Sequence, residues 1–232
     1  METTKSQDRA GDAAWQNRWE NNRIGFHKDY HHPALVKYLD NLIAGRQNCR
    51  IFIPLCGKSW DMKWLADLGH TVVGVELCEI PVRDFFKEHN VEYDILPVEG
   101  LPEAKLYKSK DGKLNLYQCN LFKLSREILG TYDCVFDRGA LIAVAKADRQ
   151  RYVDLCVSLM KPECKYLVEI VDYNSSKMKG PPFDLQHDLF EQLYGNTCNL
   201  QVLEKDVDSL SDRMKDRGLD WLTASCYMLT LK

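Results

Sequence analysis

Residues 51–59 read IFIPLCGKS, an apolar run that breaks abruptly at a glycine. The apolar part is typical of a buried strand. Residues 59–69, SWDMKWLADLG, place apolar residues at roughly helical spacing and end on glycine, so they predict a helix. Residues 71–77, TVVGVEL, predict a second buried strand, and residues 79–90 a second helix. This alternation predicts parallel strands joined by right-handed crossovers.

The rest of the chain breaks the strict alternation in two places. Residues 105–109 and 113–121 flank Lys110-Asp111-Gly112, which indicates a hairpin with a DG turn. Further strands are expected at 132–137, 164–171, 200–205 and 224–231, and helices at 148–160 and 185–194. Since no strong helix separates the last two strands, the sheet is expected to end in an antiparallel pair. Residues 174–183 are the one long loop expected.

Size and composition favour a single α/β domain. The chain has 232 residues, enough for one well-buried core, with 45% hydrophobic and 28% charged residues. A net charge of −3 gives little reason to expect a nucleic-acid partner. The polar residues 1–14 are expected to be a flexible tail, which leaves residues 15–232 as the domain.

The nine cysteines indicate a reducing compartment. They form no CxxC pair and lie mostly within apolar runs, so we expect packed, reduced thiols. Their odd number, the lack of a secretory apolar region and the lack of a run of eighteen apolar residues favour a cytoplasmic protein without a membrane span.

The turn after the first strand is the expected ligand site, because ligands bind at the carboxyl ends of strands where the strand order reverses. Gly57 lets a ligand approach the backbone, and Glu76, at the end of the second strand, can accept hydrogen bonds from ribose hydroxyls. These features fit an adenosine-containing ligand. Either one alone has a plainer explanation, the glycine as a tight turn and the acid as a solvated strand end.

The same turn argues against several nucleotides. A dinucleotide needs further glycines so that its pyrophosphate can lie on the helix N-terminus, but Lys58, Ser59 and Trp60 fill that space. The GxxxxGK[ST] loop for a nucleoside triphosphate is also absent from the sequence. S-adenosylmethionine carries ribose and adenine without phosphate, so it tolerates the bulkier turn.

Several motifs together resemble one family. FIPLCGKSWDMKWLADLGHTVVGVE, FDRGAL at 136–141, the tryptophan pair in WQNRWENNRIGFH and GPPF at 180–183 resemble animal thiopurine S-methyltransferases over residues 15–232. The resemblance implies a Rossmann-like class I methyltransferase fold, with a seven-stranded, mostly parallel sheet, an antiparallel last strand and helices on both faces. It implies S-adenosylmethionine as methyl donor and an aromatic or heterocyclic thiol as acceptor. Because a small enzyme of this fold can work as a monomer, a monomer is expected.

The resemblance also implies roles for individual residues. The residues expected beside the cofactor are Trp15, Trp19, Phe26, Leu55, Gly57, Glu76, Asn120, Leu121 and Arg138. Those expected beside the acceptor are Phe26, Arg138, Pro181, Pro182 and Arg213. Asn120 departs from the small hydroxyl residue of the family, and an extra residue in LEKDVD leaves the register of Arg213 open.

The reaction itself asks for alignment more than for a nucleophile, because a thiolate is already strongly nucleophilic. Aromatic rings of Trp15, Trp19 or Phe26 could attract the sulfonium cation, worth about 0.5–2 kcal/mol. A guanidinium at Arg138 or Arg213 would favour the ionised acceptor thiol. Arg138 is therefore the expected catalytic residue, through stabilisation of the thiolate.

Each aromatic or charged candidate has a structural alternative. Trp15 and Trp19, at i and i+4, could form the apolar face of a surface helix. Arg138 could pair with its neighbour Asp137, and Arg213 could belong to a solvated charge run.

Three further motifs also have plain readings. GPPF could be a rigid turn. Cys56 has no base beside it in the sequence, so a packed thiol is favoured over a nucleophile. His27, His31 and His32 are interpreted as a surface cluster, and no metal site is expected.

Other functions stay open at this point. A methyltransferase acting on an inorganic chalcogen, an aliphatic thiol, a protein or a nucleic acid would share the cofactor residues, although the lack of an NPPY-type stretch weighs against nucleic acid. A non-catalytic binder of S-adenosylmethionine is a second alternative. A nicotinamide oxidoreductase is disfavoured by the first turn.

Overall fold

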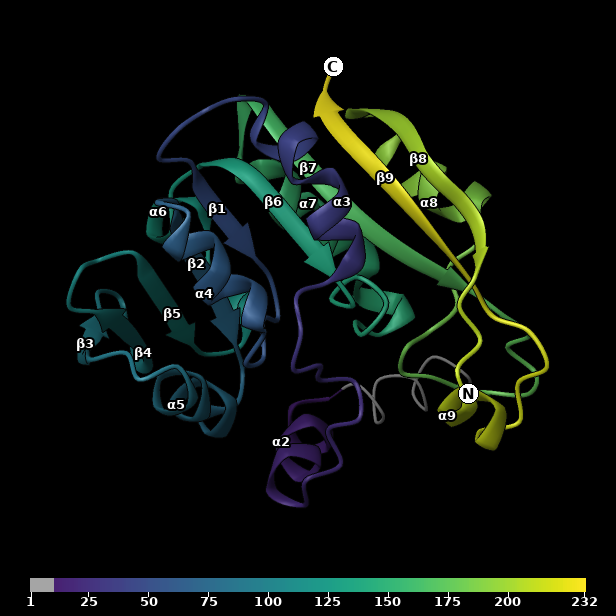
Figure 1. The fold of residues 1–232 in the computed structure, drawn as a ribbon, viewed down its shortest axis with the longest axis horizontal. Coiled ribbons are helices and arrows are strands. Elements are labelled where there is room, and N and C mark those ends of the chain that lie inside the picture. Colours follow the sequence, from purple (N-terminus) through teal and green to yellow (C-terminus); the bar gives the residue numbers. More distant parts are fainter. Residues whose placement is uncertain (1–10) are drawn as a thin grey trace.

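One mixed sheet organises the protein, and its strand order is β3-β4-β5-β2-β1-β6-β7-β9-β8 (Figure 1). The computed structural model describes residues 11–232. The strands are β1 Arg50–Ile53, β2 Thr71–Glu76, β3 Tyr93–Val98, β4 Leu101–Ser109, β5 Leu114–Gln118, β6 Tyr132–Arg138, β7 Met160–Asp172, β8 Cys198–Asp208 and β9 Thr223–Leu231.

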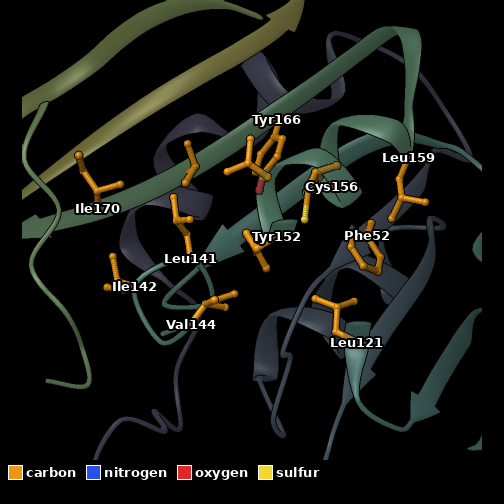
Figure 2. Close-up of a cluster of buried hydrophobic side chains, with 14 of the residues drawn as sticks. Phe52, Leu121, Leu141, Ile142, Val144, Tyr152, Cys156, Leu159, Tyr166 and Ile170 are labelled. Carbon is orange, nitrogen blue, oxygen red and sulfur yellow. The ribbon is translucent and has the colours of Figure 1, made fainter. Parts of the chain in front are cut away.

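Helices cover both faces of this sheet. They are α2 Asp12–Glu20, α3 Pro33–Ile43, α4 Trp60–Asp67, α5 Glu79–Glu88, α6 Arg126–Leu129, α7 Arg149–Ser158, α8 His187–Tyr194 and α9 Asp212–Asp216, with 3-10 turns η1 Leu121–Lys123 and η2 Lys146–Asp148. Apolar residues of α3, α4 and α5 pack with one face of the sheet, and those of α6, α7 and α8 pack with the other. Figure 2 shows part of the core on the side of α6, α7 and α8, where Tyr152 and Cys156 of α7 lie over Phe52 and Tyr166.

The central strands confirm the Rossmann-like prediction. Strands β5, β2, β1, β6 and β7 are parallel, and β9 is antiparallel to both β7 and β8, as the resemblance implied. From β1 the chain moves to β2 and β5 on one side and returns to β6 and β7 on the other. The strand order therefore reverses between β1 and β6, and that position is where such sheets bind ligands.

The expected number of seven strands was wrong, because the described residues form nine. Two antiparallel strands, β3 and β4, extend the sheet beyond β5. The hairpin around Gly112 is confirmed as the β4–β5 connection, with φ of +74° at the glycine. Strand β3 was missed because its residues are mostly exposed and include Pro97, so its sequence carries no buried-strand pattern.

Two helices near the N-terminus also differ from expectation. Helix α2 begins at Asp12, before the boundary expected at residue 15, while residues 1–10 of the expected tail lie outside the described residues. Helix α3 was not predicted, although it begins with Pro33 in its first turn and buries Leu35 and Leu42. In Figure 1, α2 lies on the side toward which the arrowheads of β1 and β6 point.

The cysteines follow the sequence prediction. All nine are free and buried. Burial raises the pKa of several of these thiols, for example that of Cys119 to about 11 and that of Cys226 to about 12. They are therefore packed, protonated side chains. Within residues 11–232, no helix is long and apolar enough to cross a membrane.

Candidate active site

A cavity of about 1010 Å³ opens at the carboxyl ends of the parallel strands. Its volume is at the upper end of the range for small-molecule sites, so it has room for a cofactor and an acceptor together. Every residue that the sequence singled out for either ligand lines it: Trp15, Trp19, Phe26, Leu55, Gly57, Glu76, Asn120, Leu121, Arg138, Pro181, Pro182 and Arg213. The fold thus brings these positions, which are spread over the whole sequence, around one space.

The first loop has an unusual backbone. Leu55, directly after β1, has φ of +44°, in the left-handed region that disfavours a branched side chain, and Gly57 has φ of +53°. A Cβ atom at Gly57 would lie 3.4 Å from the Trp19 ring. Gly57 is therefore needed for the turn, while a Cβ atom there would make only ordinary contact with the N-terminal helix.

Glu76 organises the loop from the end of β2. Its carboxylate accepts hydrogen bonds from the backbone N–H of Gly57 at 3.0 Å and from that of Cys78 at 2.8 Å. Burial raises the pKa of this carboxyl, while the backbone bonds oppose that rise. The Cys78 thiol and the Leu77 backbone N–H also contact this carboxylate, which lines the cavity and can accept from a hydroxyl group of a ligand there.

An aromatic wall closes the cavity above the loop. Phe26 meets both Trp15 and Trp19 edge-on, each with ring centroids 5.5 Å apart. The Arg18 guanidinium lies 4.4 Å from the Trp15 ring centroid. The tryptophan pair thus faces the cavity instead of forming the outer apolar face of a surface helix.

Arg138 connects this wall to the sheet. Its Nη1 donates to the carbonyl oxygen of Phe26 at 2.9 Å. The alternative ion pair with Asp137 is wrong, because Asp137 accepts hydrogen bonds from the hydroxyls of Tyr152 at 2.7 Å and Tyr166 at 2.9 Å. Successive residues of a strand point to opposite faces, which separates the two side chains.

Asn120 and Leu121 form the wall beyond β5. The Asn120 side chain accepts from the backbone N–H of Phe122 at 2.9 Å and donates to the Asp12 carboxylate at 3.0 Å. Leu121 is buried in the adjoining core. Asn120 therefore links the N-terminal helix to the cavity rim.

The opposite wall contains the proline motif and α9. The carbonyl of Pro182 accepts from the Tyr173 hydroxyl at 2.6 Å, and that of Pro181 from Arg217 Nη1 at 3.2 Å. Arg213 crosses the backbone of Gly25, where a Cβ atom would meet its guanidinium at 2.8 Å. Arg213 therefore packs against the N-terminal segment as well as lining the cavity.

The cavity lining includes polar residues that the sequence analysis did not assign to the site, among them His32, Asp61, Glu169 and Cys226. Interpreting His32 as part of a surface cluster was wrong, since its side chain is only 13% exposed. Burial lowers its pKa to about 4, and the charge of Arg138 adds to that effect. The sequence contained one indication of Glu169 as a site residue, because it is a charged residue inside the buried strand CKYLVEIV.

The histidines do not form a metal centre in the described part of the chain. Within residues 11–232, no group of three or more His, Cys, Asp or Glu side chains is placed to hold a metal ion. His31 instead stacks on Trp64, with ring centroids 4.8 Å apart. Cys56 is buried, and burial raises the pKa of its thiol, which agrees with a packed residue.

Solved structures define the class of fold. A methyltransferase from Anabaena variabilis described as S-adenosylmethionine-dependent is similar with a TM-score of 0.63 and 10% identity, over 95% of each chain. The 1,6-didemethyltoxoflavin-N1-methyltransferase of Burkholderia thailandensis is similar with a TM-score of 0.62 and 14% identity, over 95% of this chain and 88% of that one. The fold is therefore that of the class I methyltransferases.

The sequence comparisons identify the family within that class. The model of the thiopurine S-methyltransferase family matches residues 10–232. A probable thiopurine S-methyltransferase of Danio rerio is 46% identical over 94% of both chains, and the Bos taurus thiopurine S-methyltransferase is 45% identical over 94% of this chain and 89% of its own. The chain belongs to the thiopurine S-methyltransferase family. The expected methyltransferase class and the methyl donor S-adenosylmethionine are thereby confirmed.

Proposed function

We propose that the protein transfers the methyl group of S-adenosylmethionine to the sulfur of an aromatic or heterocyclic thiol, such as a thiopurine. The observation that carries the proposal is that the Glu76 loop and Arg138 line one and the same cavity. One part of the cavity suits the donor and the adjoining part the acceptor. The family match supports the same chemistry.

The donor occupies the region of the first loop and of Asn120 and Leu121. Ribose hydroxyls would donate to the Glu76 carboxylate, which the backbone N–H groups of Gly57 and Cys78 hold in place. Gly57 leaves the backbone accessible, and the rings of Trp15, Trp19 and Phe26 face the cationic sulfur. Such a cation–π contact contributes about 0.5–2 kcal/mol.

The acceptor occupies the region between Arg138, Arg213 and the proline pair, and Phe26 adjoins both ligands. A guanidinium remains protonated at all working pH values, so Arg138 lowers the pKa of a thiol bound beside it. The thiolate then attacks the methyl carbon, and the carbon–sulfonium bond breaks with its electron pair going to the departing sulfur. Alignment of the two ligands accounts for about 7–11 kcal/mol of the barrier.

The first experiment is isothermal titration with S-adenosylmethionine and, separately, NAD, followed by a methyl-transfer assay on a heterocyclic thiol. We expect saturable binding of S-adenosylmethionine alone, with methylated product. Binding without turnover on any aromatic thiol would point to a chalcogen, an aliphatic thiol or a binding role. Binding of NAD alone would contradict the proposal.

The role of Arg138 has its own test. Arg138→Ala should lower turnover more than it lowers affinity for S-adenosylmethionine, because the guanidinium acts on the acceptor sulfur. The same two quantities, turnover and affinity for S-adenosylmethionine, are measured for Arg213→Ala as a comparison, because Arg213 lies on α9, outside the sheet. Equal losses of turnover and cofactor affinity in Arg138→Ala would restrict its role to cofactor binding.

The setting of the enzyme is part of the proposal. Nine free, buried thiols support a reducing, cytoplasmic compartment. We propose that residues 15–232, preceded by the start of α2, act as one domain and as a monomer without nucleic-acid partners. Sedimentation of the purified chain tests the monomer.

A further inference from the structure

A row of polar side chains crosses the floor of the acceptor region. Arg138 of β6 is in register with Glu169 of β7, Glu169 with Cys226 of β9, and Cys226 with Glu204 of β8. All four line the cavity. Because neighbouring strands are about 4.8 Å apart, one small acceptor can contact two adjacent members of the row.

Within this row, and in the described residues, the carboxylate of Glu169 forms no ion pair with a Lys or Arg side chain within 4.0 Å, although the charge of Arg138 acts on it from the neighbouring strand. Glu204 forms an ion pair with Lys37, and Arg138 donates to the Phe26 carbonyl. Around Glu169, the Cys226 thiol lies at 4.0 Å and His32 Nε2 at 3.6 Å, both too distant for strong bonds. A half-buried carboxylate with such weak partners is suited to accept a bond from a ligand.

The environment of Glu169 suits a base. Burial raises the pKa of its carboxyl, and Arg138 opposes that rise. A base with a pKa nearer to neutral accepts protons more effectively at working pH. His32 beside it is neutral at pH 7, since burial lowers its pKa to about 4, so it does not neutralise the carboxylate.

The reaction needs such a group whenever the acceptor arrives protonated. Arg138 stabilises a thiolate but cannot take up a proton. Building on the proposed function, we propose that Glu169 is a catalytic residue that removes the proton from neutral acceptors. The carboxylate takes the proton from the S–H group or, in a thione, from the ring N–H. The sulfur bonds to the methyl carbon, and the electron pair of the broken carbon–sulfonium bond remains on S-adenosylhomocysteine.

The test compares two acceptors that differ in protonation. At neutral pH, para-nitrothiophenol is already ionised, whereas a thiopurine keeps its proton on the ring. Glu169→Gln keeps the size of the side chain but abolishes the base. We expect kcat/KM for the thiopurine to fall about 100-fold, and that for para-nitrothiophenol to change little.

Two further variants make the test specific. Glu204→Gln makes the same change one strand away from Cys226, in a side chain held by Lys37, and should leave the ratio between the two acceptors unchanged. Glu169→Asp retains a shorter base and should recover part of the thiopurine activity. If Glu169→Gln folds poorly, Glu169→Asp provides the comparison of the two acceptors in its place.

The outcomes separate the two proposals. Equal losses for both acceptors in Glu169→Gln, or no loss for the thiopurine, would overturn the role of Glu169 while leaving methyl transfer intact. Wild-type protein that methylates neither acceptor would overturn the proposed function, and this inference with it.

Discussion

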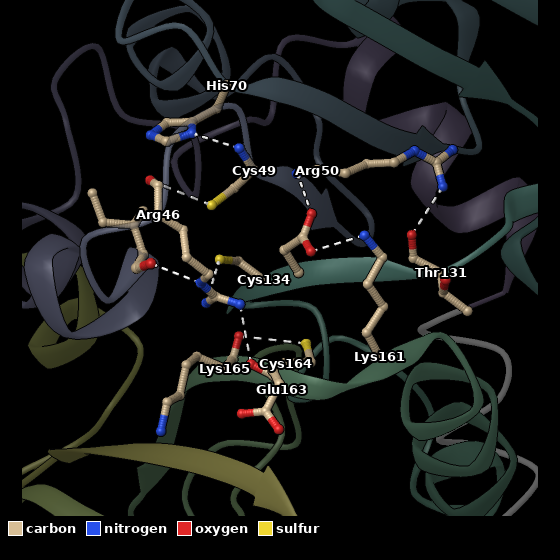
Figure 3. Close-up of polar contacts among 12 residues, drawn as sticks. Arg46, Cys49, Arg50, His70, Thr131, Cys134, Lys161, Glu163, Cys164 and Lys165 are labelled. Carbon is tan, nitrogen blue, oxygen red and sulfur yellow. Dashed lines mark hydrogen bonds and ion pairs between the residues drawn. The ribbon is translucent and has the colours of Figure 1, made fainter.

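At the amino edge of the central strands, polar groups are bonded to other parts of the chain, whereas at the carboxyl edge several keep unused bonding capacity. Figure 3 shows the amino edge, where one carboxylate, that of Asp133, accepts from the backbone N–H of Arg50 at 2.8 Å and from Lys161 at 2.8 Å. Arg50 Nη1 also donates to the Thr131 carbonyl at 3.1 Å. These bonds lock the starts of β1, β6 and β7 together.

The loop before β1 is closed in the same way. Arg46 donates to the carbonyls of Ile43, Leu42 and Glu163, and the backbone N–H of Cys49 donates to His70 Nδ1 (Figure 3). The Arg46 guanidinium is therefore engaged by backbone carbonyls, so its role is to stabilise the fold.

The carboxyl edge contrasts with this closed network. The Glu76 carboxylate lines the cavity, Glu169 has only weak neighbours, and His32 Nδ1 is buried without a partner in the described structure. Since buried polar groups are nearly always bonded, unused capacity gathered around one cavity indicates where ligands bind. Both edges of the sheet carry polar side chains. What distinguishes the structural edge from the functional one is whether the hydrogen bonds of those side chains are all made within the protein.

The largest expected effect comes from Asp137, the most fully bonded acid of the carboxyl edge. Asp137→Ala removes the acceptor for two tyrosine hydroxyls and for the backbone N–H groups of Ala140 and Leu141. We expect the free energy of unfolding to fall by about 3–5 kcal/mol, because four buried donors lose their partner. Urea unfolding measures it. A change below about 1 kcal/mol would mean that the tyrosines find other partners.

The next effect is a pH dependence caused by His32. Its folded pKa is about 4, below the ordinary 6.5, so between these values the unfolded chain binds a proton that the folded chain does not. Stability should therefore decline as the pH falls from 6.5 to 4, by about 3 kcal/mol from this residue. His32→Gln should show a shallower decline in urea unfolding across that range. Parallel profiles for the two proteins would refute the contribution.

A smaller effect is expected for cofactor binding at Glu76. Glu76→Ala should weaken the binding of S-adenosylmethionine by about 1–3 kcal/mol, through loss of charge-assisted bonds to the ribose and of the bonds that shape the Gly57 turn. Calorimetric titration measures it, with Glu76→Gln as the isosteric control. An unchanged dissociation constant would remove Glu76 from the site.

The smallest effect is expected at the amino edge. Asp133→Asn should reduce the free energy of unfolding by about 1 kcal/mol, since its bonds to Arg50 and Lys161 are partly exposed. Methyl transfer and cofactor affinity should not change. A loss of activity without a loss of stability would break the distinction between the two edges.

Much of the fold could be read from local patterns. The strand, turn and helix around residues 51–69 were predicted to within a few residues, because an apolar run, a glycine and a helical repeat are independent local signals. The DG hairpin and the antiparallel pair of the last two strands were also predicted from the sequence. Strand β3 and helix α3 were missed because the first is stabilised by its pairing with β4 and the second by packing on β6 and β7.

By itself, the sequence determined the strand–turn–helix unit, the reduced state of the cysteines and the twelve candidate site residues, because each rests on local chemistry or on motifs. Only the tertiary structure decided that these twelve surround one cavity and that Asp137 turns away from Arg138. It also decided that Glu169 stands between Arg138 and Cys226. The reason is that register between strands distant in sequence sets which side chains meet, and no local pattern encodes that register.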